Sequence, residues 1–192
     1  MIMINDFLIT MMLKRAGDIH ADVNQKFDGK PYVFHLKQVL IAAMKYGQDI
    51  DQFEKYKYII AFGACYHDTI EDARLTYNDV LKEAKKFFND EDAKTATEIV
   101  YALTNEKGRT RAERANDKYY EGIRETPFAT FIKFCDRFAN YSYSVENKTS
   151  MAKKYKYEMP HFIETLLQPK EDTPLYMVPN SILVDLQHLS NI

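Results

Sequence analysis

Apolar residues recur along most of this chain at steps of three and four, the spacing of helices that bury one face. Leu36, Val39, Leu40 and Ala43 form one such stripe, and residues 80–88 carry another. No sustained alternation with a period of two is present, and no Asn-Gly or Asp-Gly pair stands between alternating apolar residues. The pattern predicts an all-α domain with almost no β-structure.

We expect about eight helices joined by short loops. Their predicted ranges are residues 4–24, 34–46, 51–67, 76–89, 91–103, 110–123, 128–145 and 151–167. Thr76 followed by Asp79 is typical of a helix start, and Asp51 is the predicted cap of the helix that follows it. Asp28-Gly29-Lys30-Pro31 separates two helical patterns, so we expect an interhelix loop there.

Prolines interrupt the helical pattern after the last of these helices. Pro169, Pro174 and Pro179 precede a short amphipathic segment, residues 182–189. A length of 192 residues suits one domain with a tail. We therefore expect a helical domain over residues 1–168 and an appended tail with a short helix over residues 169–192.

Charge and composition exclude several classes of function. Lys plus Arg number 26 and Asp plus Glu 28, so the net charge of −2 provides no overall positive field for nucleic acid. The longest apolar run, residues 58–66, is far shorter than the roughly 20 residues of a membrane span. Cys65 and Cys135 form no close-spaced pair, and the first residues have the reverse charge order of a signal peptide. These features predict a cytoplasmic protein without a nucleic-acid or membrane partner.

The strongest chemical signal is His67-Asp68, which follows an apolar helix. An imidazole nitrogen and a neighbouring carboxylate oxygen can share one divalent cation, and this mixed set suits Mn²⁺, Fe²⁺ or Zn²⁺. His35 can supply a second imidazole. Asp136 lies within an apolar run, where an unpaired carboxylate is costly, and it can supply a second carboxylate. His20, His161 and His188 stand alone, as most histidines do, and are assigned no site role.

Three motifs occur in a specific order: PYVFH (31–35), HDTIED (67–72) and KFCDRFAN (133–140). On these motifs the chain resembles the HD-domain metal-dependent phosphohydrolase superfamily, whose signature is H…HD…D. It is most similar to the hydrolase domain of RelA/SpoT enzymes and to the metazoan SpoT homologue. The resemblance covers about residues 15–165 and implies a single HD-type helical bundle.

The resemblance also implies roles for individual residues. One Mn²⁺, or alternatively Fe²⁺ or Zn²⁺, is held by His35, His67, Asp68 and Asp136. Glu71 and Asp72 orient or deprotonate the attacking water. The implied substrate is a small nucleotide, and the implied reaction removes a 3′-pyrophosphate from guanosine tetra- and pentaphosphate alarmones, or phosphate from a reduced dinucleotide.

Contacts to the substrate are assigned to Lys26, Lys133, Asn140 and Arg109. Lys133, Asp136 and Asn140 are spaced to share one face of a helix. Lys133 is equally well explained as a structural charge, and Arg137 is expected to point elsewhere into a structural ion pair. The run of Lys107, Arg109, Arg111, Arg114 and Lys118 fits a polyphosphate tail or a solvated helix face.

The chain departs from the alarmone hydrolases at several positions. Lys26-Phe27 replaces their Arg-Lys pair, which removes a guanidinium that could stack on guanine. Phe27 is either another base platform or, as is commoner for Phe, a core or exposed residue. Leu103-Thr104-Asn105 replaces their Val-Thr-Lys, and Ala139 replaces a frequent histidine. These changes indicate altered phosphate contacts rather than loss of activity, so a nucleotidase or phosphodiesterase for another nucleotide is one alternative. A nucleotide-binding module without turnover is another, against which the intact Glu71 and Asp72 argue.

The sequence leaves open whether the chain forms a homo-oligomer. The tail is one candidate contact. Two tyrosine pairs, Tyr141 with Tyr143 and Tyr155 with Tyr157, are interpreted as packing or interface residues.

Overall fold

The structure is a computed structural model that describes residues 6–104, 109–110, 113, 116–167 and 176–191. Within those residues the chain is helical apart from one two-stranded hairpin, so the predicted all-α class is confirmed. In chain order the elements are α1 (Phe7–Asp22), β1 (Lys26–Phe27), β2 (Lys30–Pro31), α2 (Val33–Gly47), α3 (Phe53–Tyr66), α4 (Tyr77–Ala84), α5 (Asp90–Ala102), α7 (Asp117–Glu125), α8 (Ala129–Glu146), α9 (Met151–Leu166) and α10 (Asn180–Ser190).

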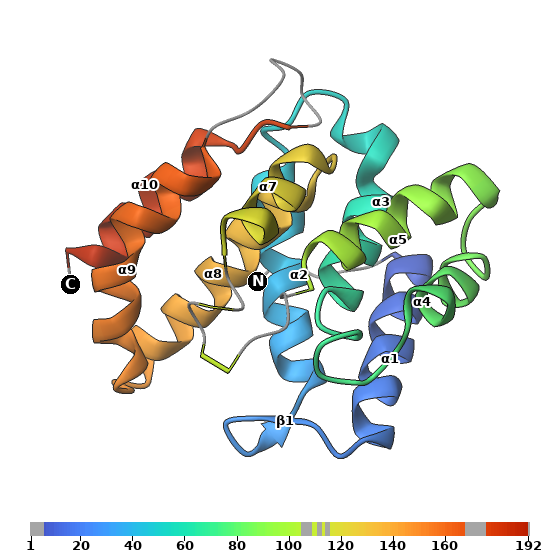
Figure 1. Ribbon diagram of the computed structural model, residues 1–192, viewed down its shortest axis with the longest axis horizontal. Coiled ribbons are helices and arrows are strands. Elements are labelled where there is room, and N and C mark those ends of the chain that lie inside the picture. The colour runs from blue at the N-terminus through green and yellow to red at the C-terminus, as the bar shows by residue number, and fades with distance from the viewer. Residues whose placement is uncertain (1–5, 105–108, 111–112, 114–115, 168–175, 192) are drawn as a thin grey trace.

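Helix α2 lies at the centre of the bundle, where it packs against α1, α3 and α8. Figure 1 shows α9 and α10 side by side at one end of the molecule and α4 with α5 at the other. The predicted stripe of α2 is fully buried, because Leu36, Val39, Leu40 and Ala43 each have an exposed fraction of 0%. The helical period therefore identified the central core correctly.

Polar side chains set several helix ends. Thr76 and Asp79 form a capping box at the start of α4, where the sequence predicted a helix start. The expected helix over residues 76–89 ends earlier, at Ala84, and Asn89 caps the start of α5. The predicted Asp51 cap is wrong. Gln52 occupies the cap position of α3 with a φ of 59°, and the Asp51 carboxylate accepts a bond from the Gln52 amide instead.

The first helix and α7 begin later than predicted. Asp6 caps α1 by accepting bonds from the amides of Leu8 and Ile9. Asn116 caps α7 by accepting from the amide of Tyr119. The first residues of both predicted ranges cannot be compared in full, because residues 4–5, 111–112 and 114–115 lie outside the described residues.

The expected loop at Asp28-Gly29-Lys30-Pro31 is in fact a tight β-hairpin. Lys26 pairs with Pro31 and Phe27 pairs with Lys30 across its two short strands. The turn residues Asp28 and Gly29 have φ angles of 47° and 77°. A two-residue hairpin turn with positive φ at both positions favours an Asp-Gly pair. The prediction failed because strands of two residues are too short to show a period.

Helix α10 is part of the core rather than an appended tail. Ile182 and Leu186 are fully buried, and the helix packs against α8 and α9. Tyr46 of α2 donates a hydrogen bond of 2.5 Å to the carboxylate of Asp185. The short helix predicted at residues 182–189 is therefore present, but it packs on the core instead of standing apart from it. Pro169 and Pro174 lie outside the described residues.

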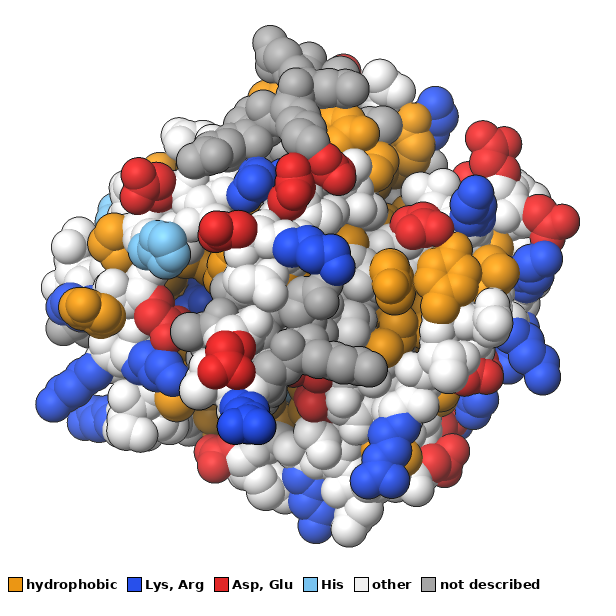
Figure 2. Space-filling model, in the orientation of Figure 1, with side chains coloured by type: hydrophobic (Ala, Val, Ile, Leu, Met, Phe, Trp, Pro, Cys, Tyr) orange, Lys and Arg blue, Asp and Glu red, His pale blue; other side chains and the backbone are white. Residues whose placement is uncertain are grey.

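The surface carries mixed charge. Figure 2 shows Lys and Arg side chains interspersed with Asp and Glu over the visible face, in agreement with the small net charge of the sequence. Among the described residues, no helix has both the length and the apolar character to span a bilayer.

A close approach of three helices depends on Gly63 of α3. A Cβ atom at this position would lie 2.5 Å from Ile132 Cδ1 of α8 and 2.9 Å from Ile99 Cγ2 of α5. We predict that Gly63→Ala lowers the free energy of unfolding by about 1–3 kcal/mol, because it overpacks a buried contact. Urea denaturation followed by circular dichroism measures this change.

Gly122→Ala is the matched control. Gly122 lies within α7, and a Cβ atom there would meet nothing within 4 Å. Alanine should therefore raise the free energy of unfolding by about 0.5–1 kcal/mol through its better helix propensity. Equal stabilities for Gly63→Ala and the unmodified protein would contradict the close packing of α3 on α8.

Candidate metal centre and its pocket

His67 and Asp68 are held at the end of α3 by tight turns. The Thr69 hydroxyl donates to the Tyr66 carbonyl over 2.7 Å, and the Asp72 amide donates to the Asp68 carbonyl over 2.8 Å. His67 Nδ1 lies 2.9 Å from the Ala64 carbonyl oxygen. Because a carbonyl can only accept, Nδ1 carries a proton, and Nε2 is the nitrogen that can take up a cation or a second proton.

Two further helices bring His35 and Asp136 to the same point. His35 Nε2 of α2 lies 3.3 Å from His67 Nε2 and 3.6 Å from Asp68 Oδ2. Asp136 Oδ1 of α8 lies 3.4 Å from His35 Nε2 and 3.7 Å from His67 Nε2. His67 Nε2 and Asp68 Oδ2 are 2.7 Å apart. The structure thus brings together all four predicted ligand residues.

These separations fit a divalent cation. Donors about 2.1 Å from one ion lie about 3.0 Å apart at right angles and about 3.4 Å apart in a tetrahedron. The ligand atoms of His35, His67 and Asp68 all lie within 4.8 Å of one another and could hold a metal ion. Asp136 lies outside this group of three, but its Oδ1 is close to both imidazole nitrogens.

The electrostatics of the cluster formed by His35, His67, Asp68 and Asp136 favour positive charge. Burial alone would lower the pKa of His35, but the carboxylates of Asp136 and Asp68 outweigh it and raise that pKa to about 9. Burial would raise the pKa of Asp68, but His67 and His35 hold it well below its usual range. Two nearly buried carboxylates therefore need a proton or a cation between them.

Lys133 and Asn140 fix the position of Asp136. Lys133 Nζ lies 3.2 Å from Asp136 Oδ2, and the Asn140 amide donates to Asp136 Oδ1 over 2.5 Å. The shared helix face predicted for these residues is therefore confirmed. Burial would lower the pKa of Lys133, but Tyr119 and Asp136 outweigh it, so the ammonium stays charged. This ion pair supplies the partner that a buried Asp136 requires.

Tyr32 links the cluster to Asp72. The Tyr32 hydroxyl lies 2.6 Å from Asp68 Oδ2 and 2.8 Å from Asp72 Oδ2, so its single proton is shared between two carboxylates. Its ring stacks on buried His20, with centroids 4.4 Å apart. Sequence reasoning missed Tyr32, although it lies in the quoted motif PYVFH three residues before His35.

A cavity of about 610 Å³ opens from the cluster. Its lining includes both predicted water-activating residues, Glu71 and Asp72, beside His35, Asp68 and Asp136. Lys133 and Asn140 also line it. This volume lies within the range of pockets that hold small organic ligands.

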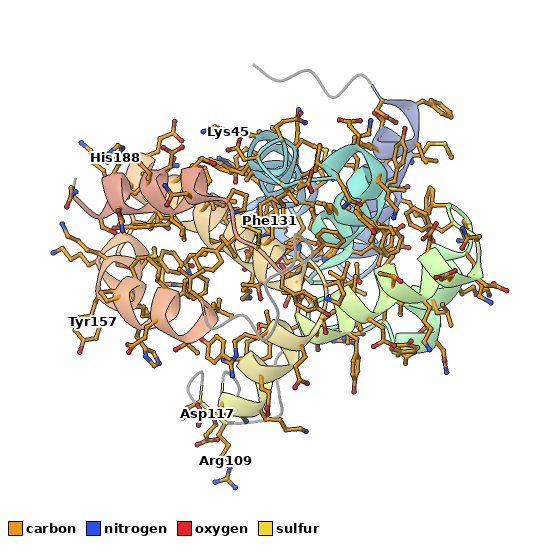
Figure 3. The ribbon with its side chains drawn as sticks, turned by 90° about the horizontal axis from the view of Figure 1, so that it is seen from above. Lys45, Arg109, Asp117, Phe131, Tyr157 and His188 are labelled. Atoms are coloured by element: carbon orange, nitrogen blue, oxygen red, sulfur yellow. The ribbon has the colours of Figure 1, made fainter. Side chains whose placement is uncertain are left out.

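The structure does not bring the other predicted substrate contacts to this cavity. Lys26 is exposed on β1 and is not part of the lining. Arg109 projects away from the body of the molecule beyond Asp117, as Figure 3 shows. Asn105, Lys107, Arg111 and Arg114 lie outside the described residues.

Three further residues lie beside the metal centre or its cavity. Phe27 stacks on the His35 ring, with centroids 4.8 Å apart and planes inclined by 11°. Arg137 makes the expected ion pair, with Nη1 2.9 Å from Glu158 Oε2, yet it still lines the cavity. His161, which received no site role, lines the cavity from α9. A lone histidine has no sequence neighbour that could have revealed this position.

Comparison with known proteins adds no assignment. No protein-family model matches the chain, and no curated protein matches it.

Loss of the Asp136 carboxylate should weaken metal binding. We predict that Asp136→Asn lowers the affinity for Mn²⁺ at least about tenfold, because a neutral amide replaces a charged ligand. Isothermal titration calorimetry measures the affinity, and melting curves verify folding. His188→Asn, at an exposed position on α10 (Figure 3), should bind Mn²⁺ like the unmodified protein. An unchanged affinity in Asp136→Asn would remove Asp136 from the ligand set.

Removal of the Tyr32 hydroxyl should destabilise the metal-free protein. Two charged acceptors lose their shared donor in Tyr32→Phe, so the free energy of unfolding should fall by about 1.5–3 kcal/mol. Chemical denaturation in the presence of a chelator measures this loss. Tyr157→Phe, at a position that is 88% exposed, should change stability by less than about 0.5 kcal/mol. A similarly small effect at Tyr32 would show that its hydroxyl makes no net contribution.

Proposed function

We propose that the protein is a metal-dependent phosphohydrolase that cleaves a phosphoester or pyrophosphate bond of a small nucleotide. The observation that carries this proposal is the convergence of His35, His67, Asp68 and Asp136 beside a cavity, with His35, Asp68 and Asp136 in its lining. The motif resemblance to HD-domain phosphohydrolases points to the same chemistry and makes guanosine tetraphosphate the first candidate substrate.

The four converging residues would hold one divalent cation, with Mn²⁺ as first choice and Fe²⁺ or Zn²⁺ as alternatives. A cation so held would lower the pKa of a water molecule and neutralise charge on a phosphoryl oxygen.

The chain's own side chains supply the remaining functions. Hydrolysis forms a bond from the water oxygen to phosphorus, breaks the bond from phosphorus to the leaving oxygen, and transfers a water proton to a base. Asp72, tied to Tyr32, and Glu71 are the carboxylates of the cavity that can accept this proton. Lys133 and Asn140 keep Asp136 oriented.

One observation favours a nucleotide other than an alarmone. Phe27 is engaged with the His35 ring, and neither Phe27 nor Lys26 lines the cavity. The residues at the Arg-Lys position of alarmone hydrolases are therefore not part of the cavity lining. The second candidate function is a nucleotidase or phosphodiesterase that acts on a different nucleotide.

The decisive experiment is hydrolysis of guanosine tetraphosphate with added Mn²⁺. Release of GDP and pyrophosphate would support the alarmone substrate, and Asp68→Asn should lower the rate at least about a hundredfold because the metal ligand is lost. If metal-loaded protein leaves this substrate intact, the same assay with other nucleotides tests the second candidate. Failure with every nucleotide would overturn the proposal.

Glu71→Gln separates catalysis from binding. The variant should retain Mn²⁺, because Glu71 is not among the converging ligands, but it should lose roughly 10²–10⁴-fold in rate if the carboxylate takes the proton. A metal-bound wild-type protein that binds nucleotides without turnover would instead be a binding module.

A further inference from the structure

The cavity has a second half that the proposed chemistry does not use. Beyond the metal centre it is lined by planar side chains from two helices. Tyr119 and Tyr120 lie on α7, and Tyr155, His161 and Phe162 lie on α9. Planar rings from two helices that border one cavity are typical of sites for flat aromatic ligands.

Arg137 joins the two halves of the cavity. It follows Asp136 on α8, and its guanidinium lies 4.3 Å from the ring centroid of Phe162 and 4.8 Å from that of Tyr155. Its ion pair with Glu158 holds the group in place. The side chain is 8% exposed, so a planar cation is fixed in the cavity wall. Guanidinium planes stack on aromatic ligands as well as on aromatic side chains.

The opposite side of the metal centre is closed. Phe27 covers the His35 ring, and Tyr143 packs edge-on against Phe27 with centroids 5.0 Å apart. The Tyr143 hydroxyl donates to the Asp28 carboxylate over 2.6 Å, which fastens the hairpin to α8. Neither aromatic residue lines the cavity. A ligand at the metal centre therefore has room to extend toward α7 and α9 but not toward the hairpin.

We propose that the part of the cavity between α7 and α9 is a subsite for the planar base of the nucleotide. The base stacks on the ring of Tyr120, beside the Arg137 guanidinium that already lies against Phe162 and Tyr155, while its phosphate reaches the metal centre. This inference rests on the proposed function for the identity of the ligand as a nucleotide. The subsite itself is defined by side chains that are separate from the metal ligands.

Nucleosides test the subsite without any phosphate to hydrolyse. Calorimetric titration of the full chain with adenosine, guanosine and ribose should show that at least one nucleoside binds about tenfold or more tightly than ribose. Equal binding of all three compounds, or binding of none, would overturn the subsite. Because no phosphoester is present, this result does not depend on whether the protein is a hydrolase.

Variants of Tyr120 localise the binding. Tyr120→Phe keeps the ring and should keep the preference for a nucleoside, whereas Tyr120→Leu fills similar space without a ring and should reduce it about fivefold or more. Tyr157→Leu is the control, since Tyr157 points outward from α9 (Figure 3) and should leave the preference unchanged. Equal nucleoside binding by Tyr120→Phe and Tyr120→Leu would overturn stacking on Tyr120.

The two proposals fail in different ways. Nucleoside binding that depends on the Tyr120 ring, in a protein that hydrolyses no nucleotide, would support the subsite and reject the phosphohydrolase. Nucleotide hydrolysis by a protein that binds nucleosides no better than ribose would support the phosphohydrolase and reject the subsite.

Discussion

Two carboxylates lie nearly buried between two imidazoles, and the surrounding structure is arranged to satisfy their charge. The side chains of Asp68 and Asp136 have exposed fractions of 19% and 13%. A carboxylate removed from water without partners is strongly destabilising, so each needs donors within hydrogen-bonding reach. Tyr32 supplies one for Asp68, and Lys133 with Asn140 supplies two for Asp136. Lys133 and Asn140 lie on the same helix as Asp136, whereas Tyr32 with Asp68 and His35 with Asp136 connect different elements. These two contacts help to position α2 against the end of α3 and against α8.

Sequence patterns predicted those features that depend on neighbours along the chain. The apolar stripe of α2 and the helix start at Thr76 were predicted from local spacing, and both are present. The structure also brings together the four residues of the H…HD…D order, although binding of a metal by them stays a prediction. Local spacing and short motifs predict these features because the face that a helix buries is determined by the sequence of that helix.

Features that depend on distant contacts could not be predicted in this way. The burial of Ile182 and Leu186 depends on where α10 meets α8, and the place of His161 in the cavity depends on how α9 lies over α8. Asp51 had the residue type of a cap, but the positive φ of Gln52 directs the chain into α3 differently. The hairpin signal of Asp28-Gly29 was visible, yet its strands were too short to confirm it by periodicity.

The close contact at Gly63 has a consequence for the ion that the cluster could accept. His67 follows Gly63 by about one helical turn in α3, and Asp136 follows Ile132 by about one turn in α8. The spacing of the two helix axes at Gly63 therefore determines how far apart donors from the two segments lie one turn later. Gly63, which has no side chain and contacts no metal ligand, would thus help to determine whether the site prefers a smaller or a larger ion. The metal ligands alone would not reveal this influence on ion preference.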